Sequence, residues 1–410
     1  HFSIHSNYAQ LPAYEAAMRK AHGEARAADI LERSPQNAVL FPSLAAKGSP
    51  LIRFGFVTTN SITQTFGRRV IARALDGTTP LSVLLAIPDH PWTKATPDAA
   101  MVRIAMTVVA RGRQDGRRLR IISERGLDSD TPDIRFSETV GRINADLSVG
   151  ANVSSAQPLL ANAWLCSRGV SLHGAGFIVS PAEAEMLGLG RREGLERHIR
   201  PYRNGRDLTA RARGVMVIDL LGLSETEVRQ RFPEVYGHVL REVKPERDGN
   251  ARATYRDQWW LFGEPRRELR PALEGLSRYI ATVETAKHRI FQFLDADTLP
   301  DNKLICIATA DSWILGMLQS STHEAWYLAN AGMLGVYDQP AVYVKTTSFD
   351  PFPFPDAGET ARRIISELAD ELDATRKRIL AQTPDLTLTG LYNLHAKLIT
   401  GEHLGSLAMS

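Results

Sequence analysis

Three stretches of this sequence carry side chains whose types and spacing suit contact with nucleic acid. The first two interleave arginines with aromatic and amide residues, and the third adds aromatics: RPYRNGRDL at 200–208, YRDQWWLFGEPRRELRPAL at 255–273 and SFDPFPFPD at 348–356. Arginine can grip a phosphate through two hydrogen bonds, aromatic rings can stack on bases, and amides can read base edges. Paired tryptophans such as Trp259 and Trp260 are more often packing residues, so no single stretch is decisive. Together, the three stretches favour a nucleic acid as the ligand.

Two groups of residues are the main candidates for this contact. The first surrounds Gly205, which predicts a loop tip, and loops on a rigid scaffold are where recognition residues concentrate. It consists of Arg200, Tyr202, Arg203, Asn204 and Arg206. The second is a polar trio between two strand-like runs and consists of Lys287, His288 and Arg289.

Length and composition set the broad class. A chain of 410 residues is long enough for two or three domains, each with its own core. No apolar run approaches the roughly 20 residues that span a bilayer, and the start lacks the apolar core of a signal peptide. The two cysteines, Cys166 and Cys306, lie in apolar surroundings without metal-ligand spacing. We therefore expect a cytoplasmic protein with no membrane contact and no metal site.

The charge of the chain is unevenly placed. The formal net charge is only +3, but six arginines fall within residues 111–125 and eight within 191–213. Such clusters set local potentials in a way that the small net charge does not. The basic clusters strengthen the case for a polyanionic partner.

The first 125 residues alternate short apolar runs with polar segments, as an α/β domain does. We expect one or two polar helices within residues 8–35. The elements expected after them are a strand at 54–59, a helix at 68–75, and strands at 81–87, 101–110 and 119–123. This order is how an open α/β sheet ends, with an antiparallel strand at its edge. The strings GxGxxG, GxxxxGKS and HExxH are absent, so no nucleotide-cradling loop is predicted.

Several segments occur in the same order as in one enzyme family. They are GFVTTNSI at 55–62, PWTKATPDAAMVRIAM at 91–106, INADLSVGANVSSAQPL at 143–159, RPYRNGRDL at 200–208, WWLFGEPR at 259–266, SRYIATVETAKHRIFQFL at 277–294 and FDPFPFP at 349–355. With them the chain resembles the C-terminal part of the large adenine-specific DNA methyltransferases of bacterial restriction-modification and phage-defence systems. That group includes fused type II, BREX-like and DISARM-like enzymes.

The resemblance implies the C-terminal half of a class I (Rossmann-like) methyltransferase sheet, an α+β target-recognition domain and a C-terminal amphipathic helix. It implies S-adenosylmethionine as cofactor, double-stranded DNA as partner and the N6 of adenine as methyl acceptor. The implied domains are a partial catalytic domain at 1–125, a connector and start of the recognition domain at 126–197, the recognition domain at 198–356 and a helical spacer at 357–410.

The family's glycine-rich cofactor motif and its Asn-Pro-Pro-aromatic catalytic motif are both absent from this sequence. The chain also begins at His1 rather than at a methionine. We therefore expect a piece that follows the catalytic motif, inactive alone and partnered by a missing N-terminal half or by defence-system subunits.

The resemblance also assigns candidate residues to the catalytic part. Methyl transfer to a base in a duplex requires the base to be flipped out and held against an aromatic ring. Trp92 occupies the loop where the family places such a ring, although it could instead cap the sheet edge. Thr59, Asn60 and Ser61 follow the end of a strand, where α/β sheets place ligands, although they could equally cap the next helix.

The recognition part has its own local signals. Ser180 and Ser224 each precede a segment typical of a capped helix. Residues 358–380 repeat Ile and Leu between charges and predict an amphipathic helix, which serves either as a spacer or as a helix packed on its own domain. His323 has no second ligand at helical spacing, so we interpret it as an interior residue.

Two function classes remain open from the sequence. One is the methyltransferase part described above, which predicts activity when the missing half is supplied. The other is a DNA-binding specificity module without catalysis, which predicts DNA binding by this chain alone. RNA methylation is disfavoured because no compact RNA-binding module is recognisable.

Overall fold

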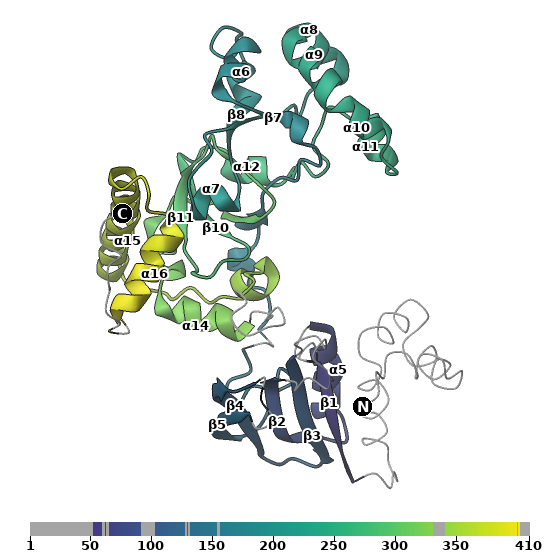
Figure 1. Cartoon of the computed structure of the whole chain (residues 1–410), viewed down its shortest axis with the longest axis vertical. Helices are drawn as coiled ribbons and strands as arrows, with labels where there is room; N and C mark the ends of the chain where they lie inside the picture. Colours follow the sequence, from purple (N-terminus) through teal and green to yellow (C-terminus); the bar gives the residue numbers. More distant parts are fainter. Residues whose placement is uncertain are drawn as a thin grey trace. The chain divides into compact units, whose positions relative to one another are not determined.

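The computed structural model describes residues 52–59, 62, 65–91, 103–127, 129, 132–153, 156–330, 341–399 and 401. Of these, the residues up to Ala156 form one compact unit, unit 1, and those from Gln157 onward form a second, unit 2 (Figure 1). The helices expected within 8–35 lie outside the described residues. Each unit is described by itself below.

Unit 1 is built on a five-stranded sheet with one helix. In chain order its elements are β1 (Arg53–Thr59), α5 (Thr65–Leu75), β2 (Leu81–Pro91), β3 (Arg103–Arg111), β4 (Gly116–Arg125) and β5 (Asp133–Gly141). The strands follow the order β1-β3-β2-β4-β5. Because β3 is antiparallel to both β1 and β2, these two strands run parallel to each other, joined through α5.

The position of β3 differs from the sequence-based expectation. The last expected strand, at 119–123, falls in β4, which lies inside the sheet between β2 and β5, while β3 lies between β1 and β2 and is buried along most of its length. The crossover through α5 leaves room between two parallel strands, and β3 fills it by pairing on both sides. The strand that follows β4 in the sheet is β5, an antiparallel edge strand at 133–141, so the sheet continues beyond residue 125.

The core of unit 1 explains this arrangement. Ile71 and Leu75 of α5 pack with strand residues such as Val83 and Val109, which are buried to 1% and 0% exposure. Figure 1 shows α5 lying against the sheet. A turn that includes Leu147 adds further apolar side chains to the same cluster.

Unit 2 contains two four-stranded sheets, with strand orders β11-β10-β13-β6 and β12-β8-β9-β7. Its strands are β6 (Cys166–Arg168), β7 (Ile178–Val179), β8 (Ile199–Arg203), β9 (Met216–Ile218), β10 (Arg278–Val283), β11 (Gln292–Asp295), β12 (Leu299–Pro300) and β13 (Leu304–Ile307). All pairs are antiparallel except β12 with β8. β6 pairs with β13. A strand of the expected connector at 126–197 and strands of the expected recognition domain at 198–356 therefore share one sheet.

The helices of unit 2 surround these sheets. They are η3 (Leu160–Asn162), η4 (Ala175–Phe177), α6 (Pro181–Met186), η5 (Leu195–Arg197), α7 (Gly205–Thr209), α8 (Glu225–Arg231), α9 (Pro233–Glu242), α10 (Lys244–Asp248), α11 (Ala253–Asp257), α12 (Leu269–Leu273), α13 (Ser312–Leu318), α14 (Ser321–Asn330), η6 (Lys345–Phe349), α15 (Glu359–Gln382) and α16 (Leu388–Ile399). The caps expected at Ser180 and Ser224 are confirmed: each hydroxyl accepts from the third helical amide, and the glutamate there accepts from the cap residue.

Two of the three aromatic stretches lie largely in the interior. Trp259 is 4% exposed, and Trp260 donates its indole N–H to the carbonyl of Leu223. Phe349 and Phe352 are buried as well. These rings supply core packing, so they are not available for stacking on bases, and the proline-aromatic run is part of the core.

Helix α15 covers the segment in which the sequence predicts an amphipathic helix, and it packs on its own unit. Asp373 accepts from the backbone N–H of Phe293, while Arg376 donates to the carbonyl of Phe291 at 3.0 Å. Both charged side chains are buried. The helix therefore packs on its own domain, which was one of the two alternatives left open by the sequence.

Candidate nucleic-acid interface

A cavity of about 450 Å³ on unit 2 joins segments that are far apart in the sequence. We call it the basic cavity, and its lining consists of Asn204, Gly205, Arg206, Thr209, Val283, Thr285, Asp301 and Lys303. The segment expected to be a loop around Gly205 forms one wall, but it is not a loop tip: Asn204 joins the end of β8 to the start of α7 at Gly205. The other wall comes from β10 and the residues that follow it, just before the trio at 287–289.

The wall at Gly205 is fixed by a helix cap. Asn204 caps α7 by accepting from the N–H of Asp207, whose carboxylate accepts from the N–H of Asn204 in return. A Cβ on Gly205 would lie 3.0 Å from Cγ1 of Val283, so the glycine allows α7 to approach β10 closely. Arg206 follows, exposed and without a side-chain partner among the described residues.

Most other candidates in this loop are used internally. Arg200 donates to the carbonyls of Asp297 and Ala296 at 2.8 and 2.7 Å, and burial lowers its pKa. Tyr202 is 2% exposed and donates to Asp301 at 2.7 Å, and burial raises its pKa. Since Tyr202 has no free face, it does not stack on a base in this structure.

Arg203 occupies an intermediate position at the end of β8. It is half-buried, and its Nη1 is buried without a hydrogen-bond partner among the described residues. The exposed, unpartnered Arg206 is therefore the residue of this loop best placed for a phosphate contact.

The trio at 287–289 likewise contains both exposed residues and residues that are bonded inside unit 2. Lys287 is exposed without a side-chain partner among the described residues, and Nε2 of His288 lies 2.9 Å from Oδ1 of Asn393. Arg289 is 6% exposed and donates to the backbone carbonyls of Val283 and Ala341. Burial lowers its pKa.

The burial of Arg289 corrects its predicted role. Its guanidinium also lies 5.3 and 5.2 Å from the ring centroids of Tyr327 and Tyr343. A side chain held by carbonyls and aromatic rings cannot reach a phosphate at the surface. Arg289 instead supports the backbone beneath the basic cavity.

The structure adds three charged residues that the sequence analysis did not single out. Glu284 is buried, and its carboxylate forms ion pairs with Arg168 and with Lys303, whose Nζ lies 3.2 Å from Oε2. The side chains of Arg168 and Lys303 are 45% and 65% exposed. A lone acid inside the apolar run that precedes Lys287 was the available sequence signal for Glu284.

The segment after the tryptophan pair adjoins the same surface. The backbone of Ser171 bridges Glu264, and Arg266 donates to the carbonyl of Gly169 at 3.3 Å. Arg267 is exposed and has no side-chain partner among the described residues. The second arginine-rich stretch therefore contributes its charges, rather than its rings, next to Arg168.

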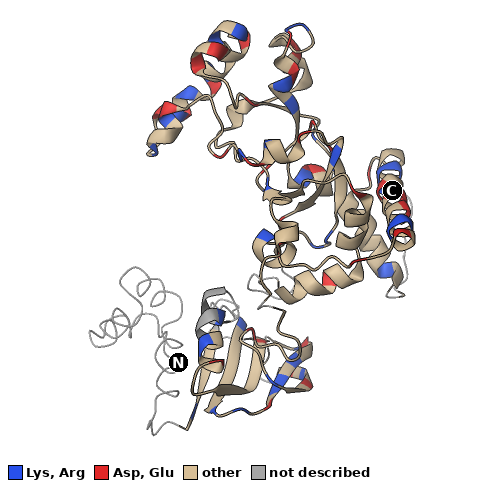
Figure 2. Ribbon diagram, turned by 180° about the vertical axis from the view of Figure 1, so that it is seen from behind, with Lys and Arg blue, Asp and Glu red and all other residues tan. Residues whose placement is uncertain are grey.

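Close backbone contact holds these segments together. Val170 bridges Asp301, and a Cβ on Gly169 would lie 2.3 Å from the carbonyl oxygens of Asp301 and Pro300. Only glycine fits such an approach. Figure 2 shows that lysines and arginines occur on both units, so the convergence of chain segments, rather than overall charge, distinguishes this surface.

In unit 1, the register of the sheet brings the predicted catalytic segments to one edge. Thr59 ends β1 opposite Ile104, and Pro91 ends β2 opposite Arg103. Arg103 is buried and holds this edge by pairing with Asp89 and Glu124, each at 2.7 Å. Asn60, Ser61 and Trp92 lie outside the described residues, as does the side chain of Thr59.

The described residues at this edge do not form a site for S-adenosylmethionine. Thr58 has a buried hydroxyl without a hydrogen-bond partner in the part of the chain that the structure describes. One orphaned hydroxyl cannot cradle a charged nucleoside, and no Gly-rich turn occurs in the sequence. The described residues at this edge therefore do not by themselves supply the cofactor site.

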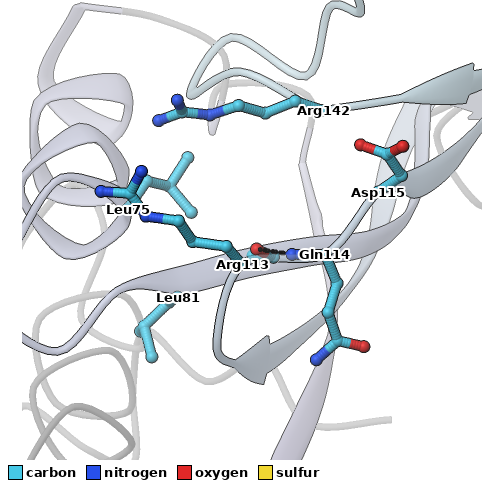
Figure 3. A pocket seen from close by; sticks show the side chains of 7 residues that line it. Leu75, Leu81, Arg113, Gln114, Asp115 and Arg142 are labelled. Atoms are coloured by element: carbon cyan, nitrogen blue, oxygen red, sulfur yellow. Dashed lines mark hydrogen bonds between the residues drawn. The ribbon is translucent and has the colours of Figure 1, made fainter.

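A second, smaller pocket of about 270 Å³ lies at the opposite end of β2. Arg113 and Arg142 extend toward Leu75 at its rim, whereas Gln114 points away (Figure 3). Arg142 pairs with Asp76 at 2.8 Å, and both side chains are two-thirds exposed. Since β2 separates this pocket from the edge at Pro91, it is not part of the predicted target-base site.

Neither a metal site nor a membrane-spanning helix occurs among the described residues. No group of three or more His, Cys, Asp or Glu side chains in these ranges could hold a metal ion. None of the helices in the same ranges is long and apolar enough to cross a membrane.

Comparison with known proteins gives a structural likeness without a sequence family. No protein-family model and no curated protein matches this chain. Its structure is similar to that of the Type IIL restriction-modification enzyme MmeI, solved in complex with DNA, with a TM-score of 0.65, 18% identity and coverage of 95% of this chain and 50% of that chain. The Type IIG restriction endonuclease BpuSI matches with a TM-score of only 0.26 at 11% identity, over 88% of this chain and 47% of that chain.

The likeness to MmeI concerns the fold. At 18% identity it shows that this mixed α/β chain, with its several mixed sheets, shares the architecture of MmeI. The chain spans about half the length of the MmeI chain, with 50% covered.

Proposed function

We propose that this chain is the DNA-binding part of a site-specific DNA methyltransferase from a restriction-modification or phage-defence system. The complete protein transfers a methyl group from S-adenosylmethionine to the N6 of adenine. The observation that carries the proposal is the basic cavity, where separate chain segments bring cations together on a fold shared with MmeI over 95% of the chain.

The cations at the cavity suit a polyanionic duplex. Arg206, which lines the cavity, and Lys287, which follows the lining residue Thr285 in the chain, are exposed without side-chain partners among the described residues, so they can approach phosphates without breaking an ion pair. Each phosphate that a cation neutralises releases condensed counterions, which drives binding. In the proposed complex these two residues fix the position of unit 2 on the DNA backbone.

Unit 1 supplies the chemical part of the proposal. We assign Trp92 to stacking on the flipped adenine and Thr59, Asn60 and Ser61 to the neighbourhood of the cofactor or target base. The support is the register that brings the ends of β1 and β2 to one sheet edge. The cofactor-binding loop and the catalytic Asn-Pro-Pro-aromatic segment come from a partner polypeptide or a missing N-terminal half.

Salt dependence of DNA binding tests the proposal. For a duplex of roughly 30 base pairs, the affinity of the full chain should fall steeply between about 50 and 200 mM salt. Replacing both Arg206 and Lys287 by alanine should make the plot of log affinity against log salt shallower by about two units. Fluorescence anisotropy of the labelled duplex measures both quantities.

A matched control removes the same charges elsewhere on unit 2. Arg241 and Lys244 are already paired with Glu242 and Asp248, so their replacement by alanine should leave the salt plot unchanged. Equal slopes for the wild type and the Arg206, Lys287 variant would reject the basic cavity as a DNA contact.

The second candidate function is a specificity module without catalysis. It is favoured by the absence of the cofactor and catalytic motifs from this sequence. Combining the chain with a polypeptide that carries both motifs separates the two functions. N6-methyladenine in the DNA, detected by mass spectrometry, supports the methyltransferase; DNA binding without methylation supports the module.

A further inference from the structure

A buried carboxylate joins two exposed cations at the rim of the basic cavity. The side chain of Glu284 is 9% exposed, whereas those of Arg168 and Lys303 are 45% and 65% exposed. Ion pairs between fully exposed groups are weak, but a buried carboxylate is costly to leave without partners. Glu284 therefore restrains both cations more firmly than a surface pair would.

The backbone around this cluster is fixed as well. The N–H of Glu284 donates to the carbonyl of Lys303 at 2.7 Å, and its own carbonyl accepts from the N–H of Tyr343 at 2.8 Å. On the other side, Gly169 packs directly against neighbouring backbone next to Arg168. The carboxylate thus sits on a rigid base, and so do the residues that it binds.

This restraint separates two kinds of cation in and near the cavity. Arg206 and Lys287, without side-chain partners among the described residues, can adapt to phosphates. Reading a base edge instead requires donors held in a set position. Arg168 and Lys303 keep further N–H donors beyond those bonded to Glu284, since arginine has five and lysine three.

We propose that Glu284 is a positioning residue that holds Arg168 and Lys303 to read acceptor-bearing base edges, such as O6 and N7 of guanine. The inference rests on the proposed DNA binding and extends it to the origin of sequence preference. It places specificity in Arg168 and Lys303, which Glu284 restrains, and bulk affinity in Arg206 and Lys287.

Glu284→Gln separates positioning from simple charge. Loss of a negative charge should keep or increase the affinity of the full chain for a pool of random-sequence duplexes. Release of Arg168 and Lys303 should reduce discrimination at one base pair on the order of 5- to 150-fold. Sequencing of the bound fraction measures discrimination, anisotropy measures bulk affinity, and thermal melting verifies folding.

Two further variants complete the test. Glu234→Gln makes the same charge change and removes an ion pair with Arg192 on another part of unit 2, so it should retain the wild-type sequence preference. Should Glu284→Gln fail to fold, Lys303→Gln removes one member of the reading pair and should lower discrimination at the same position.

The outcomes distinguish this inference from the proposed function. A folded Glu284→Gln protein that enriches the same sequence to the same degree overturns the positioning role. A wild-type chain that binds the pool without enriching any sequence also overturns it, yet leaves DNA binding intact. If the wild-type chain binds no DNA, both proposals fail.

Discussion

His323 shows what burial does to a single titratable side chain. It has no exposed surface and lies among Tyr327, Tyr343 and Phe352, with Nε2 2.9 Å from the hydroxyl of Tyr343. Burial, followed by the nearby charge of Arg289, lowers its pKa from 6.5 to about 3. The interpretation of His323 as an interior residue is confirmed, and the ring stays neutral at ordinary pH.

This lowered pKa makes unit 2 sensitive to acid. As the pH falls below 6.5, the unfolded chain protonates His323 first, so stability is lost progressively from there toward about pH 3. The loss attributable to one group approaches about 1.4 kcal/mol per pH unit. His323→Gln, which can still bond to Tyr343, should lose less stability between about pH 7 and pH 5 in urea titrations. Identical losses for both proteins would remove His323 as a source of acid sensitivity.

Arg289 and Lys287 show which part of the site the sequence could predict. Residue type and spacing identified both as cations beside a strand, and Lys287 is exposed as a contact residue must be. Burial of Arg289 depends on Tyr327 and Ala341, which are distant in sequence. Local pattern therefore predicted the chemistry at this position but not which of the two cations faces solvent.

The buried position of Arg289 makes its replacement costly. Arg289→Ala leaves buried carbonyls without a donor and should lower the free energy of unfolding by roughly 2 kcal/mol or more. The salt dependence of DNA binding by the Arg289→Ala protein should equal that of the wild type. Denaturant unfolding and anisotropy measure the two effects, and a shallower salt plot in a stably folded Arg289→Ala protein would restore the residue to the DNA contact.

At the scale of elements, local signals and non-local pairing had different outcomes. Capping boxes at Ser180 and Ser224 depend on four consecutive residues, so the sequence predicted them correctly. The insertion of β3 between β1 and β2, and the pairing of β6 with β13, depend on distant partners. The spacing of apolar residues and the composition of a segment do not identify the distant strand with which it pairs.

Gly169 follows β6 and allows it to approach its neighbours closely, whereas Gly237 has open space around it and serves as the control. Gly169→Ala would force a Cβ to within 2.3 Å of two carbonyl oxygens, so it should destabilise the protein by about 1–3 kcal/mol. Gly237 lies in α9 with no atom near its Cβ position, so Gly237→Ala should stabilise by about 0.5–1 kcal/mol. Denaturant titration gives both values. Equal effects of the two substitutions would show that the contact at Gly169 imposes no steric limit.

At the scale of the whole chain, the length predicted two or three domains, and the described residues form two compact units. The resemblance placed catalytic elements in the first and recognition elements in the second. That division of function between the two units is a proposal.

The separation of functions predicts different ligand requirements. Residues 1–410 should bind duplex DNA without S-adenosylmethionine and should show no detectable affinity for the cofactor itself, because the sequence has no Gly-rich turn to cradle it. Isothermal calorimetry with the cofactor alone measures this. Micromolar affinity would mean that the chain holds a cofactor site that its motifs do not reveal.

The side chain of Asn162 has a consequence for how the protein is made. Its buried amide donates to the carbonyls of Phe349, Asp350 and Phe352, the last 190 residues away in the chain. At bacterial-to-eukaryotic synthesis rates, roughly 10 to 40 seconds pass on the ribosome between the first and the last of these residues. For most of that interval β6 also lacks its partner β13, so the beginning of unit 2 is synthesised before the strand that covers it. The hydrogen bonds of Asn162 therefore cannot be completed until Phe352 has been synthesised.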